Sequence, residues 1–274
     1  MIDRIELLKK GLTGELHEES FWRPIRPTSV RASSAAKQLL LRKSIEWLER
    51  RGCRVFLPIV PDANARQWRE LGKDHPIVGF TMVGRKRLDN VEACVREVER
   101  NGVAGAFVEC GVWRGGVGIL AKAVLAELGS DRSVWLCDSF RGLPPPTFEQ
   151  DAGYDFCDMN DYLGVSRDRV AANFGQFGLL DERVHFLEGF FSDTLATADI
   201  GEIAVLRLDG DLYESTWQGL VALFPKVSRG GYVIIDDYGV LEPCRRAVHD
   251  FLAREKLNPE LIDIDGTGVY WRVG

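Results

Sequence analysis

The sequence predicts an α/β fold: a mostly parallel β-sheet flanked by helices, with a helical region in front of it. Two observations carry this prediction. From residue 104 onward, short apolar runs typical of buried strands alternate with longer helical segments, which is the pattern of βαβ units. Before that point the chain is rich in charges, and its apolar residues recur mainly at helical spacing. The change divides the chain into an N-terminal helical region at 1–100 and a larger α/β domain at 101–274.

In the N-terminal region the apolar spacing predicts three helices, at residues 2–12, 35–51 and 89–100. The third is followed by Asn101-Gly102, a pair typical of a helix C-terminus. Between the first two helices, residues 21–34 carry Pro24, Pro27 and several Arg and Ser residues, which indicates a loop. Residues 55–61 suit either a short strand or an irregular apolar segment.

In the α/β domain the apolar runs predict strands at residues 106–110, 134–137, 184–187, 203–208, 232–235, 261–264 and 268–272. The last two are expected to form an antiparallel hairpin that closes the sheet. Helices are expected between the strands at residues 116–128, 166–177, 215–226 and 245–254, with Ser166 as an N-cap. Residues 144–164 form a Pro-rich and then acidic loop, a length that is usually functional.

Composition excludes several classes of protein. The 274 residues include 35 Lys and Arg against 41 Asp and Glu, a net charge of −6, which argues against a basic nucleic-acid-binding surface. The charged N-terminus is unlike a secretory signal, and no stretch approaches the 18 or so apolar residues of a membrane-spanning helix. The six cysteines and four histidines are scattered without metal-binding spacing. We therefore expect a reduced, cytoplasmic protein that contacts neither nucleic acid nor a membrane.

The carboxyl ends of the strands are where an open parallel sheet binds its ligands. The first strand ends in a glycine-rich turn, Glu109 to Gly116, whose GxxxGG spacing lacks the GxGxxG dinucleotide fingerprint and so disfavours an NAD-dependent oxidoreductase. The second ends at Asp138, which suits hydrogen bonds from both hydroxyls of a ribose, although a solvated loop aspartate remains the alternative. The third leads into Gly189-Phe190, which either encloses a flat adenine ring or belongs to the core.

The fourth and fifth strands end in acidic turns that carry Asp209, Asp211, Asp236 and Asp237. Neighbouring parallel strands bring such turns together, and clustered carboxylates repel one another. The chain relieves this repulsion by raising a pKa, by supplying a cationic side chain such as Arg207, or by binding a metal ion. A hard divalent cation, Mg²⁺ by default, suits an all-oxygen site. A solvated acidic loop is the alternative.

Several motifs in order resemble those of the macrocin O-methyltransferase family: residues 107–116 (FVECGVWRGG), 135–143 (WLCDSFRGL), 207–216 (RLDGDLYEST) and 233–239 (VIIDDYG). Residues 80–90 (FTMVGRKRLDN) are similar to a further family segment. The resemblance covers about residues 76–274 well and 5–19 loosely. It implies a Rossmann-like class I methyltransferase with a seven-stranded sheet, which uses S-adenosylmethionine and Mg²⁺ to methylate sugar hydroxyls of antibiotics and related natural products, commonly as an oligomer.

The resemblance also implies roles for individual residues. The glycine turn would hold the methionine part of the cofactor, through Glu109, Gly111, Val112, Trp113, Arg114 and Gly115, with Thr81 and Met82 close by. Asp138 would bind the ribose, and Ser139 and Phe140 would lie near the adenine, as would Gly189 and Phe190. Asp209, Asp236 and Asp237 would ligate the metal. Either Asp211 or the metal-bound Asp209 would be the catalytic base.

Three functions are weighed on this basis. The favoured one is a Mg²⁺-dependent O-methyltransferase acting on a small-molecule glycoside. The second is a metal-dependent O-methyltransferase of a catechol-like phenol or another vicinal diol, which would use the same carboxylates. The third is a non-catalytic nucleoside-binding protein. Residues 31–69 depart from the family pattern and are interpreted as part of a substrate lid or an oligomer contact. Residues 144–164 are interpreted as a lid over the acceptor.

Overall fold

The computed structural model describes residues 3–17, 22–25, 27, 32–53, 55–58, 63–73, 76 and 78–274. The chain divides into two compact units. The sheet unit comprises Met1–Lys9 and Lys86–Gly274, and the N-terminal unit comprises Lys10–Arg85. Helix α1 (Arg4–Thr13), which the sequence predicted, begins in the first unit and ends in the second.

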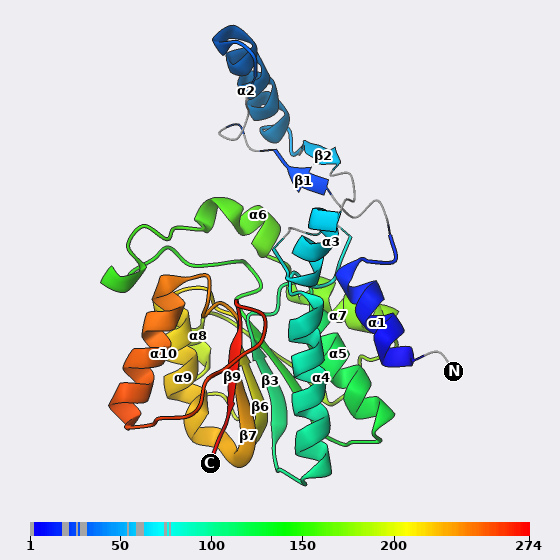
Figure 1. Ribbon diagram of the computed structural model, residues 1–274, viewed down its shortest axis with the longest axis vertical. Helices are drawn as coiled ribbons and strands as arrows, with labels where there is room; N and C mark the ends of the chain where they lie inside the picture. The colour runs from blue at the N-terminus through cyan, green and yellow to red at the C-terminus, as the bar shows by residue number, and fades with distance from the viewer. Residues whose placement is uncertain are drawn as a thin grey trace. The chain divides into compact units, whose positions relative to one another are not determined.

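The sheet unit contains a seven-stranded sheet in the order β5-β4-β3-β6-β7-β9-β8 (Figure 1). Its strands are β3 (Ala106–Cys110), β4 (Val134–Asp138), β5 (Val184–Glu188), β6 (Ile203–Leu208), β7 (Val227–Ile235), β8 (Ile262–Asp263) and β9 (Val269–Arg272). The first five run parallel, and β9 pairs antiparallel with both β7 and β8. The predicted α/β class, the mostly parallel sheet and the closing hairpin are confirmed.

The direction in which the chain adds strands reverses at the centre of the sheet. From β3 the chain moves outward to β4 and β5, then returns to place β6 on the other side of β3. Both central strands are buried along their whole length, which explains their nearly continuous apolar sequences. The crevice at such a reversal is where open α/β sheets bind ligands. Two charged residues, Glu109 of β3 and Arg207 of β6, are buried there as direct neighbours in the register.

Helices cover both faces of the sheet. Figure 1 shows α4 (Arg85–Arg100) and α5 (Gly116–Glu127) on one side, and α8 (Phe191–Thr194), α9 (Tyr213–Leu223) and α10 (Glu242–Glu255) on the other. The core on the second side joins buried apolar residues of α9 and α10 to the strands, among them Leu220, Phe251 and Trp271. Helix α7 (Arg167–Gln176) has its predicted N-cap, because Ser166 accepts a hydrogen bond from the Arg169 amide at 3.4 Å.

Four elements start earlier than the sequence predicted: α4, α9, β7 and α10, and for α4 and β7 the structure shows a physical reason. Helix α4 begins at Arg85 rather than residue 89, and its first turn buries Arg87 through ion pairs that apolar spacing does not reveal. Strand β7 begins at Val227 rather than residue 232. Its Gly230-Gly231 pair looks like a turn in the sequence, but a Cβ on Gly231 would lie 2.7 Å from the Ala204 carbonyl oxygen of β6. The glycine therefore allows a close approach of neighbouring strands.

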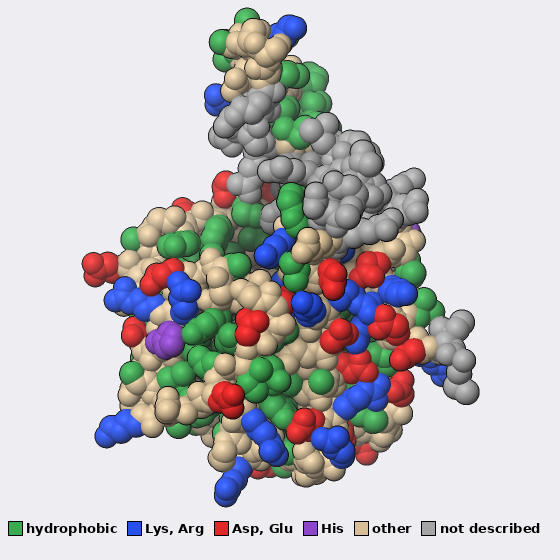
Figure 2. Space-filling view, viewed as in Figure 1, with side chains coloured by type: hydrophobic (Ala, Val, Ile, Leu, Met, Phe, Trp, Pro, Cys, Tyr) green, Lys and Arg blue, Asp and Glu red, His purple; other side chains and the backbone are tan. Residues whose placement is uncertain are grey.

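The predicted lid, residues 144–164, contains short helical turns: η3 (Glu149–Asp151), η4 (Cys157–Met159) and α6 (Asn160–Leu163). A further turn, η5 (Phe224–Lys226), follows α9. In the view of Figure 2, acidic and basic side chains are interspersed over the sheet unit. Among the described residues, no helix combines the length and the apolar character needed to cross a membrane.

The N-terminal unit contains helix α2 (Ala35–Glu49), as predicted, and a helix that the sequence analysis missed, α3 (Ala63–Glu70). Strand β2 (Phe56–Pro58) lies in the predicted apolar segment, the end of which is outside the described residues. It pairs antiparallel with β1 (Trp22–Pro24), where the prediction of a loop was wrong. Much of that predicted loop is also outside the described residues. Within the unit, buried Arg69 donates hydrogen bonds of 2.8 Å to the carbonyls of Met82 and Val83.

Candidate active site

Backbone hydrogen bonds continue just past the ends of the parallel strands and bring their turns together. They are donated by the amides of Gly111, Gly189, Asp209 and Asp236 to carbonyls of the neighbouring strands, at 2.8–2.9 Å. Two groups of turns result. We call the turns after β3, β4 and β5, which contain residues 111–116, 138–142 and 189–190, the glycine edge. We call the turns after β6 and β7, which carry Asp209, Asp211, Asp236 and Asp237, the acidic edge.

At the glycine edge, the close approach of the acidic edge requires a glycine at position 111. Its φ of +87° suits glycine, and a Cβ at this position would lie 1.8 Å from the carbonyl oxygen of Asp209. Gly115 also has a φ of +87° and caps α5, where a Cβ would lie 2.8 Å from a Val170 methyl carbon. At both points a neighbouring segment approaches so closely that a residue with a Cβ would not fit.

Asp138 organises the same turn from the neighbouring strand. One carboxylate oxygen accepts a hydrogen bond from the Val112 amide at 2.6 Å, and the other accepts one from the Phe140 amide at 2.7 Å. Burial raises the pKa of Asp138, and these hydrogen bonds oppose the rise. The structure thus places Asp138 between the first two turns, with its carboxylate already bound to their backbone. The ribose role of Asp138 stays a prediction.

Strained backbone gathers in this region. Among the described residues, four that are not glycine have a positive φ, and three of them lie in these turns: Trp113 at 47°, Phe140 at 53° and Asp211 at 61°. Such conformations are costly for bulky side chains and persist where the surrounding structure enforces them, often at functional sites. The strain therefore marks the strand ends as a candidate site independently of any motif.

The predicted lid is tied to both edges. The indole Nε1 of Trp113 donates to the Tyr162 carbonyl at 2.9 Å, next to the glycine turn. The carboxylate of Asp151, which is fully buried, accepts hydrogen bonds from the amides of Tyr213 and Glu214 at 2.7 and 3.0 Å. Asp151 therefore caps the N-terminus of α9, which begins two residues after Asp211. A lid role for this loop stays a prediction, and any lid motion would have to break these contacts.

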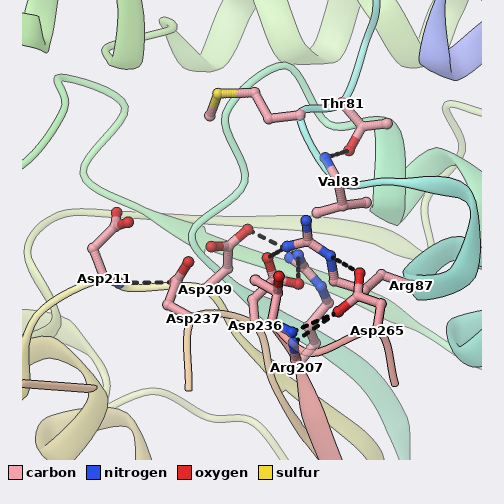
Figure 3. A network of polar contacts seen from close by, with 12 residues as sticks. Thr81, Val83, Arg87, Arg207, Asp209, Asp211, Asp236, Asp237 and Asp265 are labelled. Atoms are coloured by element: carbon pink, nitrogen blue, oxygen red, sulfur yellow. Dashed lines mark hydrogen bonds and ion pairs between the residues drawn. The ribbon is translucent and has the colours of Figure 1, made fainter. Parts of the chain in front are cut away.

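At the acidic edge, Asp209, Asp236 and Asp237 each offer a carboxylate oxygen, and these oxygens lie within 4.8 Å of one another (Figure 3). Oxygens that bind one Mg²⁺ or Ca²⁺ ion at about 2.0–2.6 Å lie at most about 4–5 Å apart. Burial, followed by the charges of Asp211, Asp209 and Asp236, raises the pKa of Asp237 well above its usual range. The donor chemistry and this repulsion both fit a hard divalent cation.

Arg207 lies beneath this cluster and is almost completely buried. It donates to Glu109 at 2.8 Å, to Asp209 at 2.8 Å and to Asp236 at 2.6 Å. Burial nevertheless raises the pKa of Glu109 to about 8, and the charge of Arg207 only partly offsets the rise. Glu109 is 1% exposed and belongs to this ion network, so any contact with a cofactor would have to come from beside the network. Its cofactor role stays a prediction.

The other predicted residues are distributed as follows. Ser139 donates to the Gly142 carbonyl at 2.6 Å and shapes the second turn. Phe190 is 37% exposed, so its ring is not a core residue. Thr81 and Met82 lie in the N-terminal unit, and their proximity to the cofactor stays a prediction. The remaining predicted positions, Val112, Arg114, Phe140 and Gly189, lie in the turns of the glycine edge.

Sequence reasoning missed two residues of the site, Arg87 and Asp265. Arg87 pairs with Asp236 and Asp265, and all three side chains are at most 6% exposed. Arg87 stands in a run of basic residues, Arg85-Lys86-Arg87, which resembles an exposed helix start. Asp265 stands in a turn-like Asp-Gly segment. The spacing of the two residues gives no sign of this pairing, because they lie 178 positions apart and only the fold brings them together.

Comparison with known proteins identifies the family of the chain. The model of the macrocin O-methyltransferase (TylF) family matches residues 2–273, almost the whole chain. The chain belongs to this family. Membership confirms the resemblance found in the motifs, and it makes the protein an S-adenosylmethionine-dependent O-methyltransferase. The glycine turn and the acidic turns described above both lie within the matched residues.

Individual relatives support the same assignment to the family of O-methyltransferases. The chain is 49% identical over 216 residues to 8-demethyl-8-(2,3-dimethoxy-alpha-L-rhamnosyl)-tetracenomycin-C 4'-O-methyltransferase of Streptomyces olivaceus, covering 77% of this chain and 81% of the relative. It is 50% identical over 208 residues to demethyldecarbamoylnovobiocin O-methyltransferase of Streptomyces niveus, covering 74% and 79%. The solved structure of the O-methyltransferase NovP superimposes with a TM-score of 0.80 at 40% identity, covering 98% of this chain and 97% of that one. The class I methyltransferase fold is thereby confirmed.

Proposed function

We propose that this protein transfers the methyl group of S-adenosylmethionine to a hydroxyl on the sugar moiety of a natural-product glycoside, with a divalent cation, Mg²⁺ by default, at the acidic edge. The observation that carries the proposal is the convergence of three carboxylates within 4.8 Å beside the glycine turn of a methyltransferase fold. The relatives' names support the acceptor class, since one of them methylates a rhamnosyl tetracenomycin.

Asp209, Asp236 and Asp237 would hold the cation, in line with their donor chemistry. When bound, such an ion lowers the pKa of an acceptor hydroxyl, which is otherwise a weak nucleophile. The sulfonium methyl of the cofactor is already activated, so the remaining task of the chain is to align the two reactants. The turns of the glycine edge would hold the cofactor, with the exposed ring of Phe190 available to its adenine.

A base must remove the hydroxyl proton, and Asp211 suits this role better than Asp209. The carboxylate of Asp209 accepts a hydrogen bond from Arg207 at 2.8 Å, whereas Figure 3 shows the carboxylate of Asp211 pointing away from the ion network. Without a bound cation, burial and then the charges of Asp209 and Asp236 raise the pKa of Asp211 to about 7. A cation held by Asp209 and Asp236 would offset the part that comes from their charges, and a carboxylate with a pKa raised by burial remains a suitable general base.

Three further features remain part of the proposal. The N-terminal region, residues 1–100, would supply lid or oligomer contacts to the methyltransferase domain at 101–274. The protein would act as a homo-oligomer. It would work in the cytoplasm, on a small molecule and without nucleic-acid or membrane partners.

A methyl-transfer assay tests the proposal. The full-length protein is incubated with S-adenosylmethionine and a panel of glycosides and catechols, with and without EDTA. We expect a glycoside to be methylated and EDTA to abolish turnover. Asp237→Asn, which is nearly isosteric, is expected to lower kcat at least about 10-fold, because even mutation of the groups that support a metal ligand typically costs about 10–100-fold. Asp199→Asn changes an exposed aspartate and is the matched control.

The outcomes separate the alternatives. Methylation that survives both EDTA and Asp237→Asn contradicts the cation role. Methylation of catechols without any glycoside favours the second function. Binding of S-adenosylhomocysteine without turnover on any member of a broad panel favours the third, a non-catalytic nucleoside-binding protein.

A further inference from the structure

Asp236 is held from two sides. Its Oδ1 accepts a hydrogen bond from Arg207 at 2.6 Å, and its Oδ2 accepts one from Arg87 (Figure 3). The side chains of Arg87 and Asp236 are 6% and 3% exposed, so water does not compete for these contacts. The two arginines come from different elements, β6 and α4. Two donors on opposite oxygens fix the plane of the carboxylate, which a single donor leaves free to rotate.

Arg87 is itself held by a third carboxylate. Its Nε donates to Asp265 Oδ2 at 3.1 Å, and the Asp265 side chain is completely buried. The other oxygen of Asp265 accepts hydrogen bonds from the amides of Thr267 and Gly268 at 2.9 and 3.0 Å. A Cβ on Gly268 would lie 3.3 Å from Cδ of Arg87, so the arginine packs against the same turn. A continuous chain of contacts thus runs from the β8–β9 turn through Arg87 to Asp236.

These contacts hold the carboxylate of Asp236 in place at the acidic edge, where neighbouring charges would displace it. Asp209, Asp236 and Asp237 repel one another, and a carboxylate attached through a soft terminal torsion turns away unless something holds it. Arg207 cannot do this alone, because it also bonds Glu109 and Asp209. Charge neutralisation by itself would need a cation near Asp236, but not a guanidinium that bridges two carboxylates, one of which is anchored to a turn.

Resting on the proposed function, we propose that Arg87 is a positioning residue for cation binding: it fixes Asp236 so that the three carboxylates present oxygens to one divalent ion, and Asp265 fixes Arg87. A positioning role and a purely electrostatic role predict opposite changes in cation affinity when Arg87 is removed. If Arg87 only supplied charge, its removal would leave the site more negative and cation binding would tighten. If Arg87 positions Asp236, its removal weakens binding despite the gain in negative charge.

The test titrates Mn²⁺ into the full-length protein saturated with S-adenosylhomocysteine and measures the Kd by calorimetry. Arg87→Met is expected to weaken Mn²⁺ binding 10–100-fold, the usual effect of losing a group that orients a metal ligand. Arg87→Lys is expected to weaken it too, because an ammonium keeps the charge but lacks the planar fork that bridges Asp236 and Asp265. Asp265→Asn should act in the same direction with a smaller effect. The affinity for S-adenosylhomocysteine should stay unchanged.

Arg96→Met is the matched control, since Arg96 lies on the same helix and also pairs with two carboxylates, Glu92 and Glu127, each at 2.7 Å. It should leave the Kd for Mn²⁺ unchanged. If Arg87→Met does not fold, Arg87→Lys and Asp265→Asn decide the matter. Unchanged or tighter Mn²⁺ binding in the Arg87 variants overturns this inference and leaves the proposed function standing. Absence of Mn²⁺ binding by the wild-type protein overturns both the inference and the cation role.

Discussion

The glycine edge and the acidic edge meet at the same end of one sheet, yet they are held together by different forces. At the glycine edge, backbone amides and a single carboxylate, Asp138, fix the turns, and the critical property is the absence of side-chain volume. At the acidic edge, buried arginines and carboxylates fix one another, and the critical property is charge. The first edge is therefore sensitive to added atoms, and the second to a change in charge.

The largest expected effect comes from removing the arginine at the centre of the acidic edge. Arg207→Met leaves Glu109, Asp209 and Asp236 without a shared partner in a region that is almost free of water. Breaking a buried ion pair in this way costs about 3–5 kcal/mol of unfolding free energy. Urea denaturation monitored by circular dichroism measures the loss.

The same substitution at Arg96 is the control, because its side chain is 35% exposed and its pairs are screened by water. It should cost no more than about 1 kcal/mol. Equal losses in the two variants would show that burial of charge does not distinguish the acidic edge.

The next largest effect is expected at the glycine edge, from adding a single carbon atom. Gly111→Ala places a Cβ 1.8 Å from the Asp209 carbonyl oxygen, in a backbone conformation with φ of +87°. The strain of such a conformation costs about 1–3 kcal/mol, and the contact with Asp209 adds to it. We therefore expect a loss of about 3 kcal/mol in unfolding free energy, together with weaker binding of S-adenosylhomocysteine in a calorimetric titration.

Gly129→Ala separates the cost of backbone strain from the cost of the steric contact with Asp209. Gly129 has a φ of +66°, but a Cβ there has nothing within 4 Å. Its substitution measures backbone strain alone and is expected to cost about 1 kcal/mol. The difference between the two variants is the contribution of the close approach between the edges. A difference near zero would mean that the two turns separate readily.

Some parts of the fold and of the two edges can be predicted from the sequence, and others cannot. Strand β6 is predicted to the residue, because a strand buried on both faces is a continuous apolar run. Asp209, Asp236 and Asp237 were predicted because acidic residues directly after such runs must converge at one edge. Arg87 and Asp265 were not, since they lie 178 positions apart and only the fold brings them together. Helix α3 was missed as well: its eight residues, ANARQWRE, are mostly polar, and Trp68 is their one large apolar side chain, too little to mark a helix by apolar spacing.

The smallest expected effect tests whether charge matters at the glycine edge at all. Asp138→Asn keeps the shape of the side chain but leaves one fewer oxygen for the amides of Val112 and Phe140, which costs about 1 kcal/mol. Burial raises the pKa of Asp138 above its ordinary value of 3.8, so the native state holds this proton more tightly than the unfolded state does. The contribution of Asp138 to the free energy of unfolding must then decline as the pH rises through the interval above about 4.

The asparagine variant lacks this titration, while every other group titrates alike in the two proteins. The difference in unfolding free energy between wild type and Asp138→Asn should therefore be largest near pH 4 and shrink toward pH 7, as followed by urea denaturation in steps of pH. A difference that grows with pH would mean that the two amide hydrogen bonds outweigh burial and favour the charged carboxylate. In that case a buried charge would stabilise the glycine edge too, and the contrast between the two edges would be one of degree.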